Sequence, residues 1–397
     1  MNLSSLLSRF NEPETLKMAK LGRELKAKGI DLTDLSLGEP DFDTPMHIKD
    51  AAKKAIDDNF SHYTPVAGFL DLRQAVCTKL KRDNGLDYTP EQIVVSTGAK
   101  QSIANTVLSI VDKDDEVIIP TPYWVTYSEI VKLAGGKVTL VKTTLENGYK
   151  ITPAELTAAI TDRTRLFMFS SPCNPTGALY SKDELKALAD VFKDHPQVFI
   201  MSDEIYEHIN FTGKHESIAQ FDFLKDRIIL INGFSKGFAM TGWRLGYIAA
   251  PLEIAKACDK VQGQFTSGPN SVAQRAGITA LLGDLRPTYE MVTKFKERRD
   301  KVMALLGEIP GVICDTPPAA FYVFPDIKAY FGKTTPAGEV INNADDLCMY
   351  FLNTAHVSVV TGKAFGEMNC IRISFANSTE NLTKGLKKIK DALAALK

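Results

Sequence analysis

Lys236 and Arg244 are the first residues whose types and spacing suggest chemistry. Both lie in residues 227–251, RIILINGFSKGFAMTGWRLGYIAAP, where an apolar run ends in Asn232-Gly233 and Lys236 follows among small residues. Single lysines are usually solvated, so an exposed lysine and an arginine facing a surface carboxylate is the ordinary interpretation. The alternative is that Lys236 holds a carbonyl cofactor as a Schiff base, with Arg244 facing an anion beside it. This stretch alone does not decide between the two.

Four other segments carry residues of the kinds that a small ligand requires. The turn Thr97-Gly98-Ala99-Lys100 leads into a helical pattern and could surround a phosphate with free N–H groups, or be a plain strand–helix turn. Trp124 could stack on a flat ring or fill the core. Asn174, in the turn SPCNPTG, could donate a hydrogen bond to a ligand oxygen. Asp203 ends an apolar run, and a buried carboxylate is costly without a cation or donor as partner.

Each of these residues follows a run with the composition of a β-strand. From about residue 91 the chain alternates between such runs and helical patterns, which predicts an α/β fold with a mostly parallel seven-stranded sheet and helices on both faces. The predicted strands are 92–96, 116–119, 137–141, 165–170, 198–202, 227–231 and 245–250. The last two runs are too close for a helical crossover, so we expect them to pair antiparallel.

The carboxyl ends of parallel strands meet at one edge of a sheet, and ligands bind there. Five of these strand ends therefore bring together an anion cradle, an aromatic plate, an amide donor, a carboxylate and an amine. This set matches the needs of pyridoxal 5'-phosphate: its phosphate, ring face, phenolic oxygen, ring nitrogen and aldehyde carbon.

Composition excludes several other classes. The 397 residues are 44% hydrophobic with a net charge of -1, and no basic stripe suggests nucleic acid or membrane as a partner. The six cysteines are scattered without a C-x-x-C pair, and neither they nor the six histidines show metal-ligand spacing. No G-x-G-x-x-G follows a strand, which disfavours a dinucleotide-dependent dehydrogenase. No leader-like start or membrane-length apolar run is visible, so we expect a cytoplasmic protein.

Seven motifs give the chain a resemblance to a known family. It resembles the class I aminotransferases, pyridoxal-phosphate enzymes of fold type I, and among them the bacterial branch of aspartate and aspartate/prephenate aminotransferases. The resemblance runs from about residue 6 to residue 396. The motifs are GEPDFDTP (38–45), YTPVAGFLDLR (63–73), STGAKQ (96–101), PYWVTY (122–127), SPCNPTG (171–177), SDEIYEH (202–208) and NGFSKGFAMTGWRLGY (232–247).

The resemblance implies roles around the cofactor ring. Lys236 resembles the catalytic Schiff-base lysine, and Asp203 the carboxylate that keeps the pyridine nitrogen protonated. Asn174 and Tyr206 resemble the partners of the phenolic oxygen, Tyr206 also counting as catalytic. Trp124 resembles the ring-stacking residue, and it and Asn174 would also contact the substrate.

The resemblance also implies roles at the phosphate. Ala99, Lys100 and Arg244 resemble phosphate-side contacts. Tyr63 resembles a tyrosine that reaches the phosphate of a neighbouring subunit, which would make the enzyme a homodimer with shared active sites.

For the substrate, Arg372 resembles the arginine that binds the α-carboxylate, and Gly38 a backbone contact to it. The implied reaction moves the amino group of L-aspartate to 2-oxoglutarate, giving oxaloacetate and L-glutamate; prephenate, an aromatic acid or alanine is the alternative substrate. Where eukaryotic-type enzymes carry an arginine for the distal carboxylate, this chain has Gly263. Lys100 is the implied substitute, which leaves it two duties.

We expect two domains. Residues 46–285 would form a large cofactor-binding domain, and residues 1–45 with 286–397 a smaller α/β domain with an N-terminal arm. The arm departs from the branch, which often has Pro-Ser-Ala-Thr where this chain has Glu12-Pro13-Glu14-Thr15. That departure weakens the expectation of prephenate as a second substrate.

Overall fold

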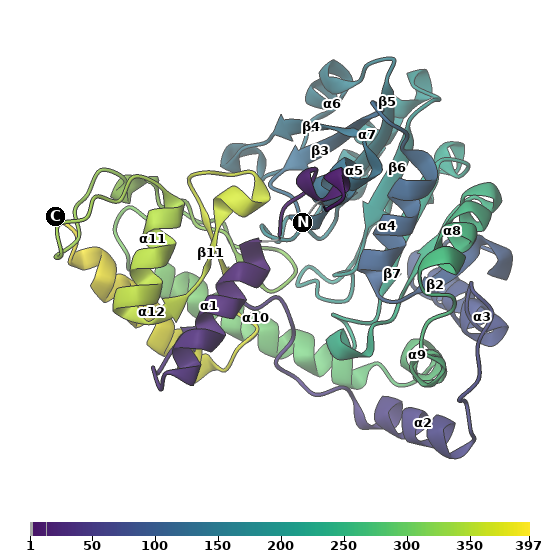
Figure 1. Ribbon diagram of the computed structural model, residues 1–397, viewed down its shortest axis with the longest axis horizontal. Helices are drawn as coiled ribbons and strands as arrows, with labels where there is room; N and C mark the ends of the chain where they lie inside the picture. The colour runs from purple at the N-terminus through teal and green to yellow at the C-terminus, as the bar shows by residue number, and fades with distance from the viewer. Residues whose placement is uncertain (1–2, 13) are drawn as a thin grey trace.

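The computed structural model describes residues 3–12 and 14–397, so Pro13 of the arm motif lies outside the described residues. Its largest element is a seven-stranded sheet (Figure 1). All strands run parallel except β8, which is antiparallel to both neighbours. In sheet order they are β2 (Ile93–Ser96), β8 (Gly246–Ala249), β7 (Ile228–Gly233), β6 (Phe199–Asp203), β5 (Thr164–Ser170), β3 (Glu116–Thr121) and β4 (Lys137–Lys142). The predicted mostly parallel sheet and its antiparallel last pair are confirmed.

Helices cover both faces of the sheet because its strands send apolar side chains to both sides. One face carries α4 (Ala99–Ile110), α5 (Thr126–Ala134) and α8 (Leu252–Phe265). The other face carries α6 (Pro153–Ala159) and α7 (Lys182–Val191) over one half, and α2 (Met46–Asp57), α3 (Leu70–Lys79) and α9 (Ser271–Leu282) over the other half. In β2, Val94 packs with the first group while Ile93 and Val95 pack with the second.

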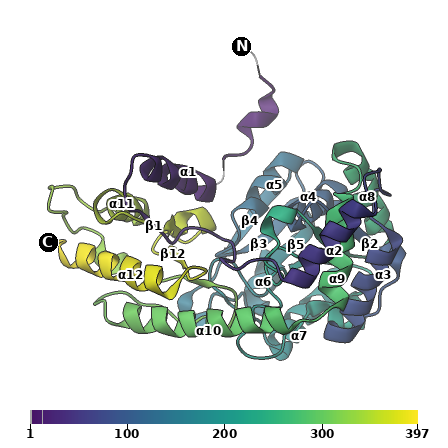
Figure 2. The ribbon, with the colours of Figure 1, turned by 90° about the horizontal axis from the view of Figure 1, so that it is seen from below.

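The remaining elements form a smaller α/β layer beside the sheet (Figures 1 and 2). Its helices are α1 (Glu14–Ala27), α10 (Arg286–Gly307), α11 (Ala344–Tyr350) and α12 (Thr379–Ala394). Its strands are β1 (Thr33–Asp34), β9 (Tyr322–Val323), β10 (Val357–Ser358), β11 (Val360–Thr361) and β12 (Ile371–Ser374). β1 pairs in parallel with β10, and β11, β12 and β9 form an antiparallel sheet in that order.

Two segments depart from regular structure. The apolar run VSVVTG (357–362) forms two short strands in different sheets, because the chain exchanges its pairing partner from β1 to β12 at Val359. The α-helix α3 ends at Lys79, and the chain continues as a short π-helix, Leu80–Asn84.

The predicted division at residues 45/46 and 285/286 stays a proposal. It is supported by a separate hydrophobic cluster that joins Phe295 of α10, Leu347 of α11 and Leu386 of α12. Tyr206, which follows β6, belongs to the same cluster and so connects the two parts through packed side chains.

Candidate active site

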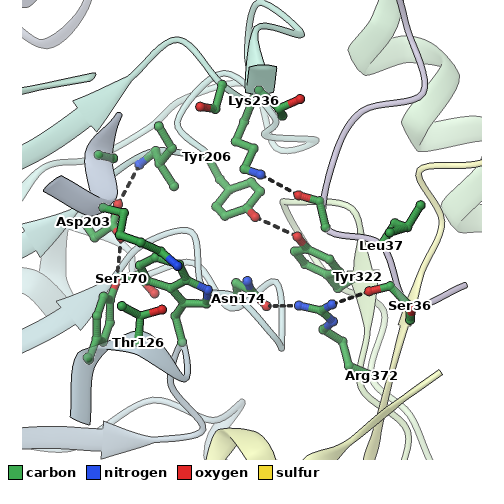
Figure 3. A pocket seen from close by; sticks show the side chains of 18 of the residues that line it. Ser36, Leu37, Thr126, Ser170, Asn174, Asp203, Tyr206, Lys236, Tyr322 and Arg372 are labelled. Carbon is green, nitrogen blue, oxygen red and sulfur yellow. Dashed lines mark hydrogen bonds between the residues drawn. The ribbon is translucent and has the colours of Figure 1, made fainter. Parts of the chain in front are cut away.

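A cavity of about 310 Å³ lies between the carboxyl edge of the large sheet and the smaller layer (Figure 3). It collects the predicted site residues except Tyr63. Those that line it are Gly38, Ala99, Lys100, Trp124, Asn174, Asp203, Tyr206, Lys236, Arg244 and Arg372. They come from positions up to 334 residues apart, from Gly38 to Arg372 (372 − 38), so the fold has built one site from the whole chain.

Lys236 lies three residues beyond the end of β7, with its side chain half-buried. Its loop is held by Thr288, whose hydroxyl donates to the Gly237 carbonyl at 2.8 Å. The Nζ atom donates to the Gly38 carbonyl at 2.5 Å. Burial lowers the pKa of this amine to about 8; Glu39 and Asp203 oppose the shift, and the positive charges of Arg372 and Arg244 add to it. A lysine in this state is close to the neutral form that a nucleophile or a general base requires.

Asp203 is the last residue of β6, whereas the sequence predicted a strand that ends at residue 202, just before it. Only 4% of Asp203 is exposed. Tyr127, from the second residue of α5, donates its hydroxyl to Oδ2 at 2.6 Å, and the Ile205 N–H donates to Oδ1 at 3.2 Å. Burial raises the pKa of this carboxyl to about 6 despite these donors. A buried carboxylate with this pKa is matched to a positively charged partner in the cavity.

Arg372, in β12, is 2% exposed. Its Nη1 donates to Asn174 Oδ1 at 3.0 Å and its Nη2 to the Ser36 carbonyl at 2.6 Å (Figure 3). The guanidinium carbon lies 4.5 Å from the Tyr322 ring centre and 5.0 Å from that of Phe365. Among the described residues its Nε has no hydrogen-bond partner. No carboxylate of the described residues forms an ion pair with this buried cation, so the site fits an anionic ligand.

The anion cradle begins at Gly98, the N-cap of α4, whose φ of 82° favours glycine. A Cβ at Gly98 would lie 2.6 Å from Arg244 Nη2, so only glycine lets the guanidinium approach. Gly246 makes a second close approach, because a Cβ there would lie 2.3 Å from the Ala99 nitrogen. The N-terminus of α4 and the side chains of two cations, Arg244 and Lys100, therefore line the same cavity.

Lys100 also contacts the aromatic wall of the cavity. Its Nζ lies 5.0 Å from the centre of the Trp124 ring, which is half-buried. Partial burial lowers the pKa of Lys100, and repulsion from Arg244 lowers it further. Two neighbouring cations at the mouth of the cavity favour a ligand with more than one negative group.

Tyr63 is fully exposed and lies outside the cavity. In one chain it contributes nothing to the site, and its predicted role requires a second subunit.

Among the lining residues that the sequence did not indicate are two tyrosines with hydrogen bonds in the site, Tyr127 and Tyr322. Tyr127 follows Trp124 by three residues in PYWVTY, and the two rings contact each other edge to face with 5.6 Å between their centres. Tyr322, in AAFYVFPD, looked like an ordinary core residue. It is fully buried, and its hydroxyl lies 2.8 Å from the hydroxyl of Tyr206.

A second group of polar residues lies behind the site. Ligand atoms of Glu204, Glu207 and His215 lie within 4.8 Å of one another, a cluster that sequence spacing did not indicate. Lys79 forms an ion pair with Glu207, and His215 pairs with Glu204 at 2.8 Å. The protein's own cations thus already neutralise these carboxylates.

The fold and the site together define a class of protein, an enzyme that binds an anionic cofactor at the carboxyl edge of a mostly parallel sheet. Comparison with known protein families supports this class. The family model "Aminotransferase class I and II" matches residues 30–389. The chain belongs to this family.

The described residues contain no helix long and apolar enough to cross a membrane.

Individual relatives and solved structures show which aminotransferases the chain is similar to. The chain is 45% identical to a probable aspartate/prephenate aminotransferase of Rhizobium leguminosarum bv. phaseoli, covering 100% of this chain and 99% of the relative. Its fold matches the crystal structure of the aspartate aminotransferase from Rhizobium meliloti with a TM-score of 0.97, at 41% identity over 100% of both chains. The aspartate aminotransferase of Thermus thermophilus with maleate matches with a TM-score of 0.92, at 38% identity over 99% of this chain and 100% of that one. The fold is that of the fold type I aminotransferases.

Proposed function

We propose that this protein is a pyridoxal-phosphate-dependent aspartate aminotransferase, which moves the amino group of L-aspartate to 2-oxoglutarate. One observation carries the proposal: a lysine amine with a lowered pKa, a buried carboxyl and a buried arginine face the same cavity. The names of the relatives support aspartate as the amino donor.

The residues present fit pyridoxal phosphate. The cradle at Gly98, Ala99 and Arg244 suits a phosphate, since it combines a helix N-terminus, a guanidinium and a backbone without a Cβ in the way. Asp203 suits a protonated ring nitrogen, and Trp124 suits the ring face. When bound, the cofactor supplies an aldehyde carbon that takes up the amino group and a ring that accepts electrons.

The protein's own groups then have definite tasks. Arg372 binds the substrate α-carboxylate through its guanidinium and fixes the orientation of the Cα–H bond. With the cofactor bound, Lys236 would hold its aldehyde carbon. The free, neutral Nζ would take the substrate Cα proton and pass it to the cofactor carbon that receives the amino group. The Gly38 carbonyl, 2.5 Å from Nζ, holds that amine within the cavity. Asp203 stays ionised as long as a cation faces it.

Lys100 is the residue we assign to the distal carboxylate of a dicarboxylic substrate. Its Nζ lies over the Trp124 ring and lines the cavity. In this assignment Arg244 binds the cofactor phosphate and Lys100 binds the substrate. Lys100→Ala should then reduce kcat/KM for aspartate more than for alanine. Equal losses would assign Lys100 to the phosphate alone.

We further propose a cytoplasmic homodimer with shared active sites. The ring of Tyr63 is fully exposed and so is free to reach a partner subunit, which is the role that the family resemblance implies for it. The six cysteines are all free, which suits a reducing compartment. Sedimentation at several concentrations, with Tyr63→Ala for comparison, tests the dimer.

A single experiment tests the cofactor assignment. The purified protein, loaded with pyridoxal phosphate, is reduced with borohydride, digested and mapped by mass spectrometry. We expect the label on Lys236 and none in Lys236→Met; a label on another lysine would refute the proposal.

A second candidate substrate is prephenate, since the Rhizobium leguminosarum relative is named for it. Following the cofactor absorbance of the loaded enzyme with aspartate, glutamate, alanine and phenylalanine in turn identifies the amino donor. Adding prephenate or 2-oxoglutarate to the aminated form then identifies the acceptor.

A further inference from the structure

Tyr322 connects three residues of the active site to one another. Its hydroxyl lies 2.8 Å from the Tyr206 hydroxyl, and the Arg372 guanidinium carbon lies 4.5 Å from its ring centre. A Cβ at Gly38 would lie 2.9 Å from its hydroxyl, so the absence of that atom makes room for it. Tyr322 thus touches the segment of Gly38, the substrate-binding arginine and the tyrosine assigned to the cofactor (Figure 3).

Strand pairing explains how Tyr322 reaches Arg372. In the antiparallel pair of β9 and β12, Tyr322 lies opposite Ser374. Arg372 and Ser374 are two residues apart and so project from the same face of β12, which makes Tyr322 and Arg372 diagonal neighbours. Both side chains are almost completely buried, so their relative position is held by packing on every side.

The two tyrosine hydroxyls have one hydrogen bond between them, and either oxygen can be its donor. Each hydroxyl has a single hydrogen. If Tyr206 donates to Tyr322, it has no hydrogen left for a ligand. If Tyr322 donates, the hydrogen of Tyr206 is free to face the cavity.

The charge of Arg372 decides between these directions. Burial raises the pKa of both phenols, and the charge of Arg372 opposes that rise in both. The guanidinium carbon lies 4.5 Å from the Tyr322 ring centre, and after burial its charge has the largest effect on the pKa of Tyr322, whereas the contact with Tyr322 raises the pKa of Tyr206 further. Tyr322 is therefore the stronger acid of the pair and the better donor.

We propose that Tyr322 is a positioning residue that donates its hydrogen bond to Tyr206 and thereby directs the Tyr206 hydroxyl hydrogen at the phenolic oxygen of the cofactor. Its ring also supports Arg372, so one side chain aligns the groups for the cofactor and for the substrate α-carboxylate. This inference rests on the proposed function.

The substitution Tyr322→Phe separates these two tasks, because it removes the hydroxyl and keeps the ring. We expect kcat to fall about three- to tenfold, the effect of one hydrogen bond, while KM for aspartate changes less than about twofold. The pH midpoint of the cofactor absorbance in the holoenzyme should move upward. A weaker donor leaves more negative charge on the phenolic oxygen, and that charge retains the neighbouring proton to higher pH. Tyr322→Leu, which also removes the ring, should raise KM as well.

Tyr350→Phe is the matched control. Tyr350 is a buried tyrosine of the smaller layer whose hydroxyl donates to the Ala392 carbonyl at 3.2 Å, away from the cavity. A general loss of packing or stability would affect both variants, whereas only Tyr322→Phe should move the absorbance midpoint.

A double-mutant cycle gives the decisive comparison. If Tyr322 acts through Tyr206, then Tyr322→Phe should shift the absorbance midpoint in the wild-type background and not in Tyr206→Phe. Equal shifts in both backgrounds, or no shift in either, would overturn the positioning role. Wild-type protein that binds no pyridoxal phosphate at Lys236 would instead overturn the proposed function, so the two failures are distinguishable.

Discussion

Replacing Lys236 by methionine should change how the stability of the cofactor-free protein depends on pH. Methionine has a side chain of similar length and cannot be protonated. Burial and nearby cations hold the pKa of Lys236 at about 8, against 10.5 for an ordinary lysine. In wild type the charged form of Lys236 therefore lowers the free energy of unfolding, and the variant has no such charge.

The size of this effect follows from the two pKa values. Their difference, 10.5 − 8, corresponds to about 3 kcal/mol at roughly 1.4 kcal/mol per pKa unit. Between pH 8 and pH 10.5 the unfolded chain binds more protons than the folded chain, so wild-type stability rises with pH in that window. Below pH 8 Lys236 is protonated in both states, and the full loss of about 3 kcal/mol is present. We expect wild type to gain about 1–2 kcal/mol relative to Lys236→Met between pH 7 and pH 9.

The assay is equilibrium unfolding in urea of both cofactor-free proteins at pH 7, 8 and 9. Salt and protein concentration stay constant, because unfolding of an oligomer depends on concentration. Other titrating groups cancel in the difference between the two proteins. Lys260→Met, at an exposed site on α8, serves as the control for removing a lysine.

A difference between wild type and Lys236→Met that stays constant from pH 7 to pH 9 would refute the reasoning. It would mean that the Lys236 amine is as well solvated in the folded protein as in the unfolded chain. The lysine would then lack the environment that supports its proposed role as a base.

Three further changes test other parts of the site. Arg372→Lys should reduce kcat/KM for aspartate about tenfold to a hundredfold, mainly through KM, because an ammonium cannot form the paired hydrogen bonds of a guanidinium; steady-state kinetics that match wild type would remove Arg372 from the substrate site. Tyr127→Phe removes the 2.6 Å donor to Asp203, whose raised pKa of about 6 means that its carboxylate is lost as pH falls through that value. Cofactor affinity, measured by equilibrium titration from pH 5 to 8, should decline below pH 6 in wild type and from a higher pH in the variant; an unchanged midpoint would contradict this. Gly98→Ala should weaken cofactor binding and destabilise the fold by about 1–2 kcal/mol, since the new Cβ meets Arg244 at 2.6 Å and φ is 82°; unfolding and titration that match wild type would show that the cradle can relax.

Much of the fold was predictable because its cause is local. The seven apolar runs, the helical patterns between them and the antiparallel last pair all appear in the structure. The split of VSVVTG into β10 and β11 was not predictable, because each half pairs with a strand far away in sequence. Periodicity identifies an extended segment but contains no information about its partner.

The candidate site divides in the same way. Residues that follow predicted strands, such as Asp203 and Lys236, could be placed at one edge because parallel strands align their carboxyl ends. Arg372 and Gly38 lie outside that pattern, and only the family resemblance pointed to them. Tyr127 and Tyr322 were missed because a tyrosine inside an apolar segment looks like core.

By itself the sequence determined the order of strands and helices, the chemical groups at each strand end and, through its motifs, the family. Only the tertiary structure decided which groups meet and in what electrostatic state. The pairing of β9 with β12 places Tyr322 against Arg372, and burial sets the pKa of Asp203 at about 6 and that of Lys236 at about 8. These properties depend on distance and on exclusion of water, and both are set by residues that the chain brings together from far apart.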